Sequence, residues 1–296
     1  MPEPLPNPIR VLVKGPSTVT WSSFMGGPRT DFAFPRAIES ELLTAGHPAR
    51  VEVSSVPSQL FTSLLPTWER EVLNFSPDVI VLCYGGFEAL HLILPRWLER
   101  HANSFKARPG RIRKLYRKRF LRPAWMALAK LQGRLDRTID PTILRWRPRR
   151  FAAELEQYIK RVQRVGRPLV YVMEYAPVAD RRRAWYPGQP ARGAIYEQRK
   201  REVVENYGRD NVRFFETNDL VTKYADGELN KAMPDGFHFS PVMHRAIGSA
   251  LAREIVDWAQ TQPHLQLPKP KPKPRRSNRK RSAGIGDVIE QSGEPG

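Results

Sequence analysis

Cysteine is nearly absent from this chain, which has Cys83 and no other cysteine among its 296 residues. An intrachain disulfide, a four-cysteine zinc site and a CxxC redox motif each need more than one cysteine, so none of them can form. The sequence also lacks a run of about 18 apolar residues, which a membrane-spanning helix requires. The N-terminal residues combine an acid with three prolines and no apolar stretch, unlike a secretory signal. These absences favour a cytoplasmic location.

Acidic residues are scarce in two segments that hold most of the net charge of +19. Residues 96–150 contain 18 Lys and Arg against three acids, and residues 268–281 contain eight Lys and Arg and no acid. These segments carry +15 and +8, so the rest of the chain has a net charge of −4. This distribution indicates a mildly acidic globular domain with two basic attachments, rather than a domain built around nucleic acid.

Hydrophobic residues make up 41% of the sequence, which is enough for a buried core in a chain of this length. The 28 prolines argue against an all-helical bundle and for many loops. We expect one α/β domain over residues 1–262. Residues 263–296 begin with Pro-Lys repeats and end in Gly, Ser and acids, which predicts a disordered tail.

Five short apolar runs alternate with segments of helical periodicity. Each run is rich in β-branched or other apolar residues, as buried strands are. The runs are residues 9–13, 51–53, 79–84, 168–173 and 212–215. The expected helices are residues 35–44, 59–74, 151–165, 194–207 and 241–258. This alternation predicts a three-layer α/β/α fold with a flavodoxin-like, parallel five-stranded sheet.

The basic segment 96–150 interrupts this alternation after the third strand. Leu, Phe and Trp lie among the Arg and Lys of residues 111–135, which predicts one or two helices. Two interpretations stay open, a solvated helical excursion and a lid that brings anionic membrane lipid or an acidic substrate to the site. The second would allow peripheral contact with the inner membrane surface. Residues 268–281 are a weaker candidate for binding nucleic acid or anionic lipid.

Candidate catalytic residues follow the first strand and precede the last helix. Ligands of open α/β sheets bind beyond the carboxyl ends of the strands, where Ser17 is expected. Asp235 and His238 are three residues apart in a loop. A serine, a histidine and a carboxylate together can perform acyl transfer, in which the imidazole takes the serine proton and the carboxylate orients the imidazole. His91 and His101 lack a partner at metal-ligand spacing, so we expect no metal and no cofactor.

Each of these residues also has a purely structural interpretation. Ser17 suits a helix N-cap, and the Asp235 and His238 pair suits a local hydrogen bond that caps the last helix. Glu88 suits the first turn of a helix, where the helix dipole favours an acid. His244 falls on the last helix, where we expect it to be packed or on the surface.

Three sequence blocks together resemble the SGNH, or GDSL-type, hydrolase superfamily. The first block, Gly15–Ser17, resembles the Gly-Asp-Ser motif, and Gly85–Glu88 resembles Gly-x-Asn-Asp after the third strand. Asp235–His238 resembles the Asp-x-x-His motif before the last helix and is the most specific of the three. The resemblance covers about residues 8–260 apart from the insertion at 96–150.

The resemblance implies an ester hydrolase with Ser17 as nucleophile, His238 as general base and Asp235 as orienting carboxylate. It implies an acyl ester as the substrate, such as a lipid, an acetylated sugar or a small carboxylic ester. The acyl group, the leaving group and the oligomeric state stay open.

Two residues depart from the family pattern at positions that bear on catalysis, and the oxyanion glycine of the family's second block has no clear counterpart in the region 54–58. Pro16 replaces the Asp of the first motif, and Phe87 replaces the Asn that donates a hydrogen bond to the oxyanion. Loss of one such donor costs about 10²- to 10³-fold in rate. The remaining oxyanion candidates are the backbone N–H groups of Ser17, Ser58 and Gly86. The alternative hypothesis is therefore a catalytically impaired SGNH-like scaffold or binding module, recruited to anionic membrane or nucleic acid by its basic segments.

Overall fold

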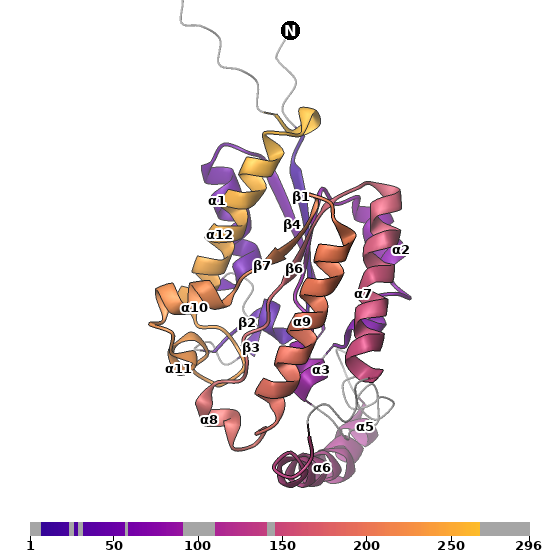
Figure 1. The fold of residues 1–296 in the computed structure, drawn as a ribbon, viewed down its shortest axis with the longest axis vertical. Coiled ribbons are helices and arrows are strands. Elements are labelled where there is room, and N and C mark those ends of the chain that lie inside the picture. The colour runs from indigo at the N-terminus through magenta and orange to yellow at the C-terminus, as the bar shows by residue number, and fades with distance from the viewer. Residues whose placement is uncertain are drawn as a thin grey trace, which may run out of the picture.

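Five parallel strands form the central sheet of the computed structural model (Figure 1). The structure describes residues 7–23, 27–28, 32–56, 59–90, 110–140 and 146–266. The strands are β1 (Ile9–Gly15), β4 (Ala49–Ser55), β5 (Val79–Leu82), β6 (Leu169–Met173) and β7 (Val212–Phe215). They are ordered β4-β1-β5-β6-β7, and every neighbouring pair is parallel. The predicted flavodoxin-like parallel sheet is confirmed.

Helices cover both faces of the sheet, because successive strand residues point to opposite sides and are apolar on both. Val11 and Val13 pack into one core, whereas Leu12 packs into the other. The first core is covered by α1 (Phe34–Thr44), α10 (Asn218–Tyr224) and α12 (Pro241–Ala259). The second is covered by α2 (Trp68–Phe75), α7 (Trp146–Val165) and α9 (Gln189–Tyr207). Figure 1 shows α1 and α12 on one side of the sheet and α2 and α7 on the other.

The prediction of one helix over residues 59–74 was wrong. The structure instead has a 3₁₀ turn, η3 (Phe61–Ser63), followed by the shorter helix α2. Pro66 lies between them. A proline has no N–H to donate and disfavours helical dihedrals in the residue before it, so the periodicity of the apolar residues continues while the helix does not.

Several short elements were not predicted, because each is too short to show a periodicity. They are η1 (Ser17–Val19), β2 (Trp21–Ser22), β3 (Gly27–Pro28), α3 (Gly86–Leu90), α8 (Asp180–Arg183), α11 (Leu229–Ala232) and η6 (Pro263–Leu265). Strands β2 and β3 pair antiparallel as a small separate sheet. Most of these elements follow the carboxyl ends of the strands, so periodicity predicts the sheet and its long helices but not the short elements at that edge of the sheet.

The described part of the basic insertion is helical, as predicted for residues 111–135. It consists of α5 (Arg111–Tyr116), a π-helical turn η4 (Arg117–Leu121) and α6 (Arg122–Leu135). Figure 1 shows α5 and α6 at the same end of the molecule as α3 and α8. The remainder of the insertion, residues 96–109 and 141–145, lies outside the described residues, as does the basic segment 268–281. None of the described helices has the length and apolar character that crossing a membrane demands.

Candidate active site

A tight turn after β1 presents Ser17. A Cβ atom at Gly15 would lie 2.4 Å from Val19 Cγ2 and 2.9 Å from the Cys83 carbonyl oxygen, so a side chain does not fit at this position. The Pro16 carbonyl accepts hydrogen bonds from the Val19 N–H, at 3.1 Å, and from the Ser55 hydroxyl, at 2.9 Å. The turn is thus fixed from two sides, and Ser17 begins η1 just beyond the carboxyl end of β1, the neighbour of the central strand β5.

The structure brings Ser17, His238 and Asp235 together in one hydrogen-bonded chain. Ser17 Oγ lies 2.9 Å from His238 Nε2, and His238 Nδ1 lies 2.7 Å from Asp235 Oδ2. An ionised carboxylate only accepts hydrogen bonds, so the proton of the neutral imidazole belongs on Nδ1. Nε2 is then free to accept the serine proton, which is the arrangement that a general base requires.

Asp235 is held in its ionised form by its own loop. Burial raises the pKa of this carboxyl group, but the His238 side chain and the backbone N–H groups of His238 and Phe237 donate to it and outweigh burial. The net effect lowers the pKa of Asp235 to about 2. The carboxylate is therefore charged at neutral pH and can stabilise an imidazolium on His238.

Gly236 lets the loop bring Asp235 and His238 close. Its φ of 94° lies in the region that glycine adopts without strain, and a Cβ there would lie 2.2 Å from Arg182 Cγ. Arg182 in turn donates from Nε to the Asp235 carbonyl oxygen at 3.1 Å. Helix α8, which carries Arg182, thus supports the loop from outside.

The buried His244 supports His238 through Trp21. The imidazole of His238 stacks on the indole of Trp21. His244, on α12, donates from Nε2 to the Trp21 carbonyl at 3.0 Å and accepts from the Phe34 N–H at Nδ1, at 3.2 Å. Burial lowers the pKa of His244 to about 4, so it is neutral and suited to accept one hydrogen bond and donate the other. His244 is packed rather than exposed and has a structural role.

The three candidate oxyanion donors are backbone N–H groups in separate segments of the chain. Ser17 opens η1 and Gly86 opens α3, whereas Ser58 lies outside the described residues. The ring of Tyr175 covers Gly86 so closely that a Cβ there would lie 2.0 Å from the ring carbons Cε2 and Cζ. Phe87 follows in α3 and has no side-chain donor.

Glu88 caps the turn that carries Gly86. Its carboxylate accepts the Gly85 N–H at 3.0 Å and the Phe61 N–H at 2.6 Å. Gly85 has a φ of 110°, which favours glycine. Glu88 is a first-turn helix acid, as the structural interpretation of the sequence held, and its two bonds fix the loop after β5.

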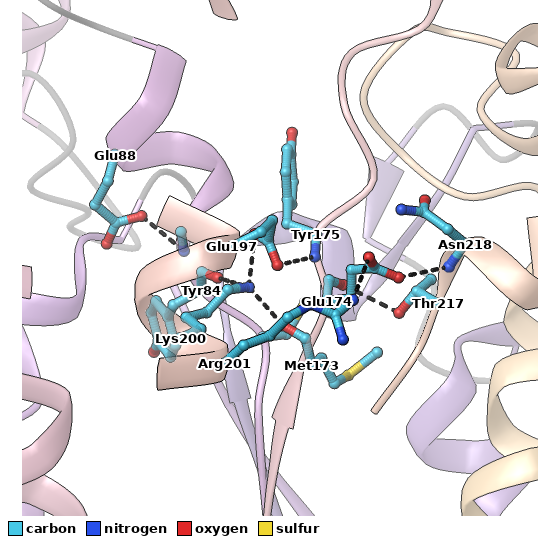
Figure 2. A network of polar contacts seen from close by, with 12 residues as sticks. Tyr84, Glu88, Met173, Glu174, Tyr175, Glu197, Lys200, Arg201, Thr217 and Asn218 are labelled. Carbon is cyan, nitrogen blue, oxygen red and sulfur yellow. Dashed lines mark hydrogen bonds and ion pairs between the residues drawn. The ribbon is translucent and has the colours of Figure 1, made fainter. Parts of the chain in front are cut away.

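Lys200 fixes the carboxyl ends of two strands and was missed by the sequence analysis (Figure 2). Its buried ammonium donates to the Tyr84 carbonyl at 3.1 Å and the Met173 carbonyl at 2.6 Å. It also pairs with Glu197 at 2.8 Å, which accepts the Tyr175 N–H at 3.2 Å. Tyr175 and the loop after β5 are therefore tied to one lysine of α9.

A separate cavity of about 600 Å³ lies beside this network. Glu174, at its wall, pairs with Arg201 at 3.0 Å and accepts the Asn218 N–H at 2.9 Å (Figure 2). Ser17, Asp235 and His238 are not among the described residues that line it. No group of three or more His, Cys, Asp or Glu among the described residues is arranged to hold a metal ion.

Comparison with known proteins identifies the fold. No family model matches the sequence, and no curated protein matches it. Among solved structures, a lipase/acylhydrolase from Enterococcus faecalis is 17% identical with a TM-score of 0.55, and the match covers 84% of this chain and 96% of that chain. The psychrotrophic esterase EstA from Pseudoalteromonas sp. is 9% identical with a TM-score of 0.50, over 84% of this chain and 98% of that chain. The chain has the fold of the SGNH, or GDSL-type, esterases and lipases, as the three sequence blocks imply.

Proposed function

We propose that this SGNH-fold chain is a serine hydrolase that cleaves an acyl ester. The observation that carries the proposal is the continuous hydrogen-bonded chain from Ser17 Oγ through His238 to Asp235. The structural comparison also supports the proposal, because the matched structures include a lipase/acylhydrolase and an esterase. The proposed substrate is a lipid, an acetylated sugar or a small carboxylic ester.

The geometry suits a two-step acyl transfer. Ser17 Oγ attacks the ester carbonyl while its proton passes to His238 Nε2, and Asp235 stabilises the resulting imidazolium. The tetrahedral intermediate collapses when His238 returns the proton to the leaving alcohol, which leaves Ser17 acylated. A water molecule then attacks the acyl group with His238 again as the base, and the serine is regenerated.

The developing oxyanion has no side-chain donor at position 87, where the family motif has an Asn. Phe87 offers no donor, so the backbone N–H groups of Ser17, Gly86 and Ser58 are the proposed partners. The loss of one side-chain donor lowers the expected rate by about 10²- to 10³-fold relative to an intact site. The enzyme is therefore expected to be slow, while its serine is still activated by His238.

A fluorophosphonate probe tests the activated serine without knowledge of the substrate. The wild-type protein should be labelled, and peptide mapping should place the adduct on Ser17. Ser17→Ala and His238→Ala should abolish labelling with the fold intact by circular dichroism. The matched control Ser249→Ala removes a half-buried hydroxyl of α12 that donates to Glu41, and should leave labelling unchanged. A folded wild-type protein that resists the probe would contradict the proposal.

A second candidate function follows from Phe87 and Pro16. An SGNH-fold domain with an impaired oxyanion site can act as a binding module, recruited through its basic segments. In that case ligand binding should be sensitive to salt and should not change in Ser17→Ala. The same purified variants therefore distinguish the two functions.

A further inference from the structure

The helical arm formed by residues 110–135 exposes large apolar side chains to solvent. Ile112 is 86% exposed, Leu115 58% and Phe120 65%. Leu115 and Phe120 lie three and eight residues after Ile112, which is a helical spacing. The ring of Tyr116 stacks on that of Phe120, with ring centroids 5.9 Å apart. These side chains therefore gather on one face of α5 and η4. A soluble chain rarely exposes such a row of large apolar residues unless something binds it.

The same arm is strongly basic. Residues 110–135 contain nine Lys and Arg and no acid. Lys114, Lys118 and Arg119 are exposed among the apolar residues. Net positive charge and exposed apolar side chains thus occur on the same two turns, in the pattern of helices that lie in a bilayer interface.

The arm is fixed to the body beside the candidate active site. Arg192 of α9 donates two hydrogen bonds to the carboxylate of Asp136, at 2.5 and 3.0 Å, and both side chains are buried. Arg192 also donates to the Ala89 carbonyl at 2.7 Å, and Gln132 donates to the Leu90 carbonyl at 2.6 Å. Ala89 and Leu90 belong to α3, the helix that Gly86 opens. The arm therefore extends from the functional end of the sheet (Figure 1).

We propose that the basic arm docks on the surface of an anionic lipid bilayer. Ile112, Leu115 and Phe120 enter the boundary between headgroups and acyl chains, while the Lys and Arg side chains bind lipid phosphates. A nucleic-acid duplex would pair with the same cations but would offer nothing to Ile112 and Leu115, since its outer surface is phosphate and sugar. A single strand would offer bases that stack on aromatic rings and would still leave these two aliphatic side chains in water. The occurrence of both features on the same short helical segment, α5 and η4, favours lipid. Docking in this orientation places the candidate active site at the membrane surface.

Sedimentation of the full chain with lipid vesicles tests this surface. The protein should bind vesicles of phosphatidylcholine mixed with phosphatidylglycerol, and should bind phosphatidylcholine alone much more weakly. Two variants of the arm should each lower binding to the mixed vesicles about tenfold or more. The apolar variant is Ile112→Ser/Leu115→Ser/Phe120→Ser, and the charge variant is Lys114→Glu/Lys118→Glu/Arg119→Glu.

Matched controls make the same kinds of substitution, apolar to Ser and basic to Glu, away from the arm. The apolar control is Leu43→Ser/Leu73→Ser/Val165→Ser, and the charge control is Arg164→Glu/Lys223→Glu/Arg253→Glu; all six positions are exposed. A third control changes the tail, as Lys269→Glu/Lys271→Glu/Lys273→Glu. All three controls should retain most of the binding. Circular dichroism and the urea midpoint should be unchanged in every variant used.

Three results would overturn the proposal. The first is a wild-type protein that does not bind the anionic vesicles, or binds neutral vesicles equally well. The second is a loss of binding in the two charge controls as large as that in the charge variant of the arm, because it would mean that net charge alone drives association, or an equal loss in the apolar control, because it would mean that the apolar effect is not specific to the arm. The third is an apolar variant with unchanged vesicle binding alongside tight binding of a homopolymer RNA by the wild type, which would assign the arm to nucleic acid.

Discussion

The imidazole of His238 stacks on the indole of Trp21, with ring centroids 5.3 Å apart and ring planes 27° apart. The Trp21 carbonyl is itself held by the Nε2 of His244, which is buried in the core at α12. A packed element on one face of the sheet thereby sets the plane of the proposed general base. This contact is independent of the hydrogen bonds that His238 makes to Ser17 and Asp235.

Trp21→Ala should lower the rate of fluorophosphonate labelling about tenfold or more, since small misplacements of a reacting group cost up to about 10²-fold in rate. Trp21→Phe keeps an aromatic face and should retain most of the rate. The matched control Trp185→Ala removes an exposed indole and should have no effect. Labelling of Trp21→Ala at the wild-type rate would show that the stack does not orient His238.

His244 should make the protein less stable in mild acid. The folded protein binds a proton on His244 only near pH 4, whereas the unfolded chain binds it near pH 6.5. The stability that neutral His244 contributes is therefore complete above pH 6.5 and is lost as the pH falls toward 4. The difference amounts to about 3 kcal/mol of unfolding free energy.

Urea denaturation of wild type and His244→Gln at several pH values measures this loss. The variant should be less stable at pH 7, because the contacts to Phe34 and Trp21 are altered, but its stability should fall less between pH 6.5 and 4. Parallel curves for wild type and His244→Gln would refute the assignment of the titration to His244.

Gly86→Ala should disturb the candidate oxyanion site through Tyr175. The added Cβ would lie 2.0 Å from the Tyr175 ring, so either the ring or the start of α3 must move. We expect labelling of Ser17 to slow while the sheet stays folded. Gly110→Ala is the matched control, because nothing lies within 4 Å of a Cβ built there. Gly86→Ala/Tyr175→Ala should recover part of the rate if the steric clash is the cause, and no recovery would indicate that Gly86 matters for another reason.

The sequence predicts the sheet and its helices and names Ser17, Asp235 and His238 as candidates, but it does not predict the residues that support them. The strands were visible because most are short runs rich in apolar and β-branched residues. Asp235 and His238 were visible because they are three residues apart just before a helix start. Lys200 was not predicted, since it lies in a helix rich in charges where one more lysine carries no signal. The helical spacing does carry a signal, because Tyr196 and Val204 lie four residues before and after Lys200. Both are buried, so Lys200 lies on the face of α9 that packs against the sheet. Trp21 and Tyr175 act through contacts between distant segments, which no local pattern encodes.

Lys200→Met should destabilise the protein strongly. The ammonium is buried, and its removal leaves the Glu197 carboxylate and the carbonyls of Tyr84 and Met173 without their partner. Breaking a buried ion pair in this way costs about 3 to 5 kcal/mol of unfolding free energy, whereas an exposed pair contributes about 0 to 1 kcal/mol. The control Lys160→Met breaks the exposed pair with Glu156 on α7 and should barely move the urea midpoint.

The double variant Lys200→Met/Glu197→Gln separates charge from packing. Because the unpaired carboxylate is then absent, it should recover part of the lost stability, although the two carbonyls stay without a donor. If Lys200→Met unfolds at the wild-type urea midpoint, the lysine does not tie β5 to β6 in solution. If the double variant regains stability but Ser17 labels slowly, then Lys200 positions the loop after β5 as well as stabilising it, because that loop carries Gly86 and the Glu88 cap.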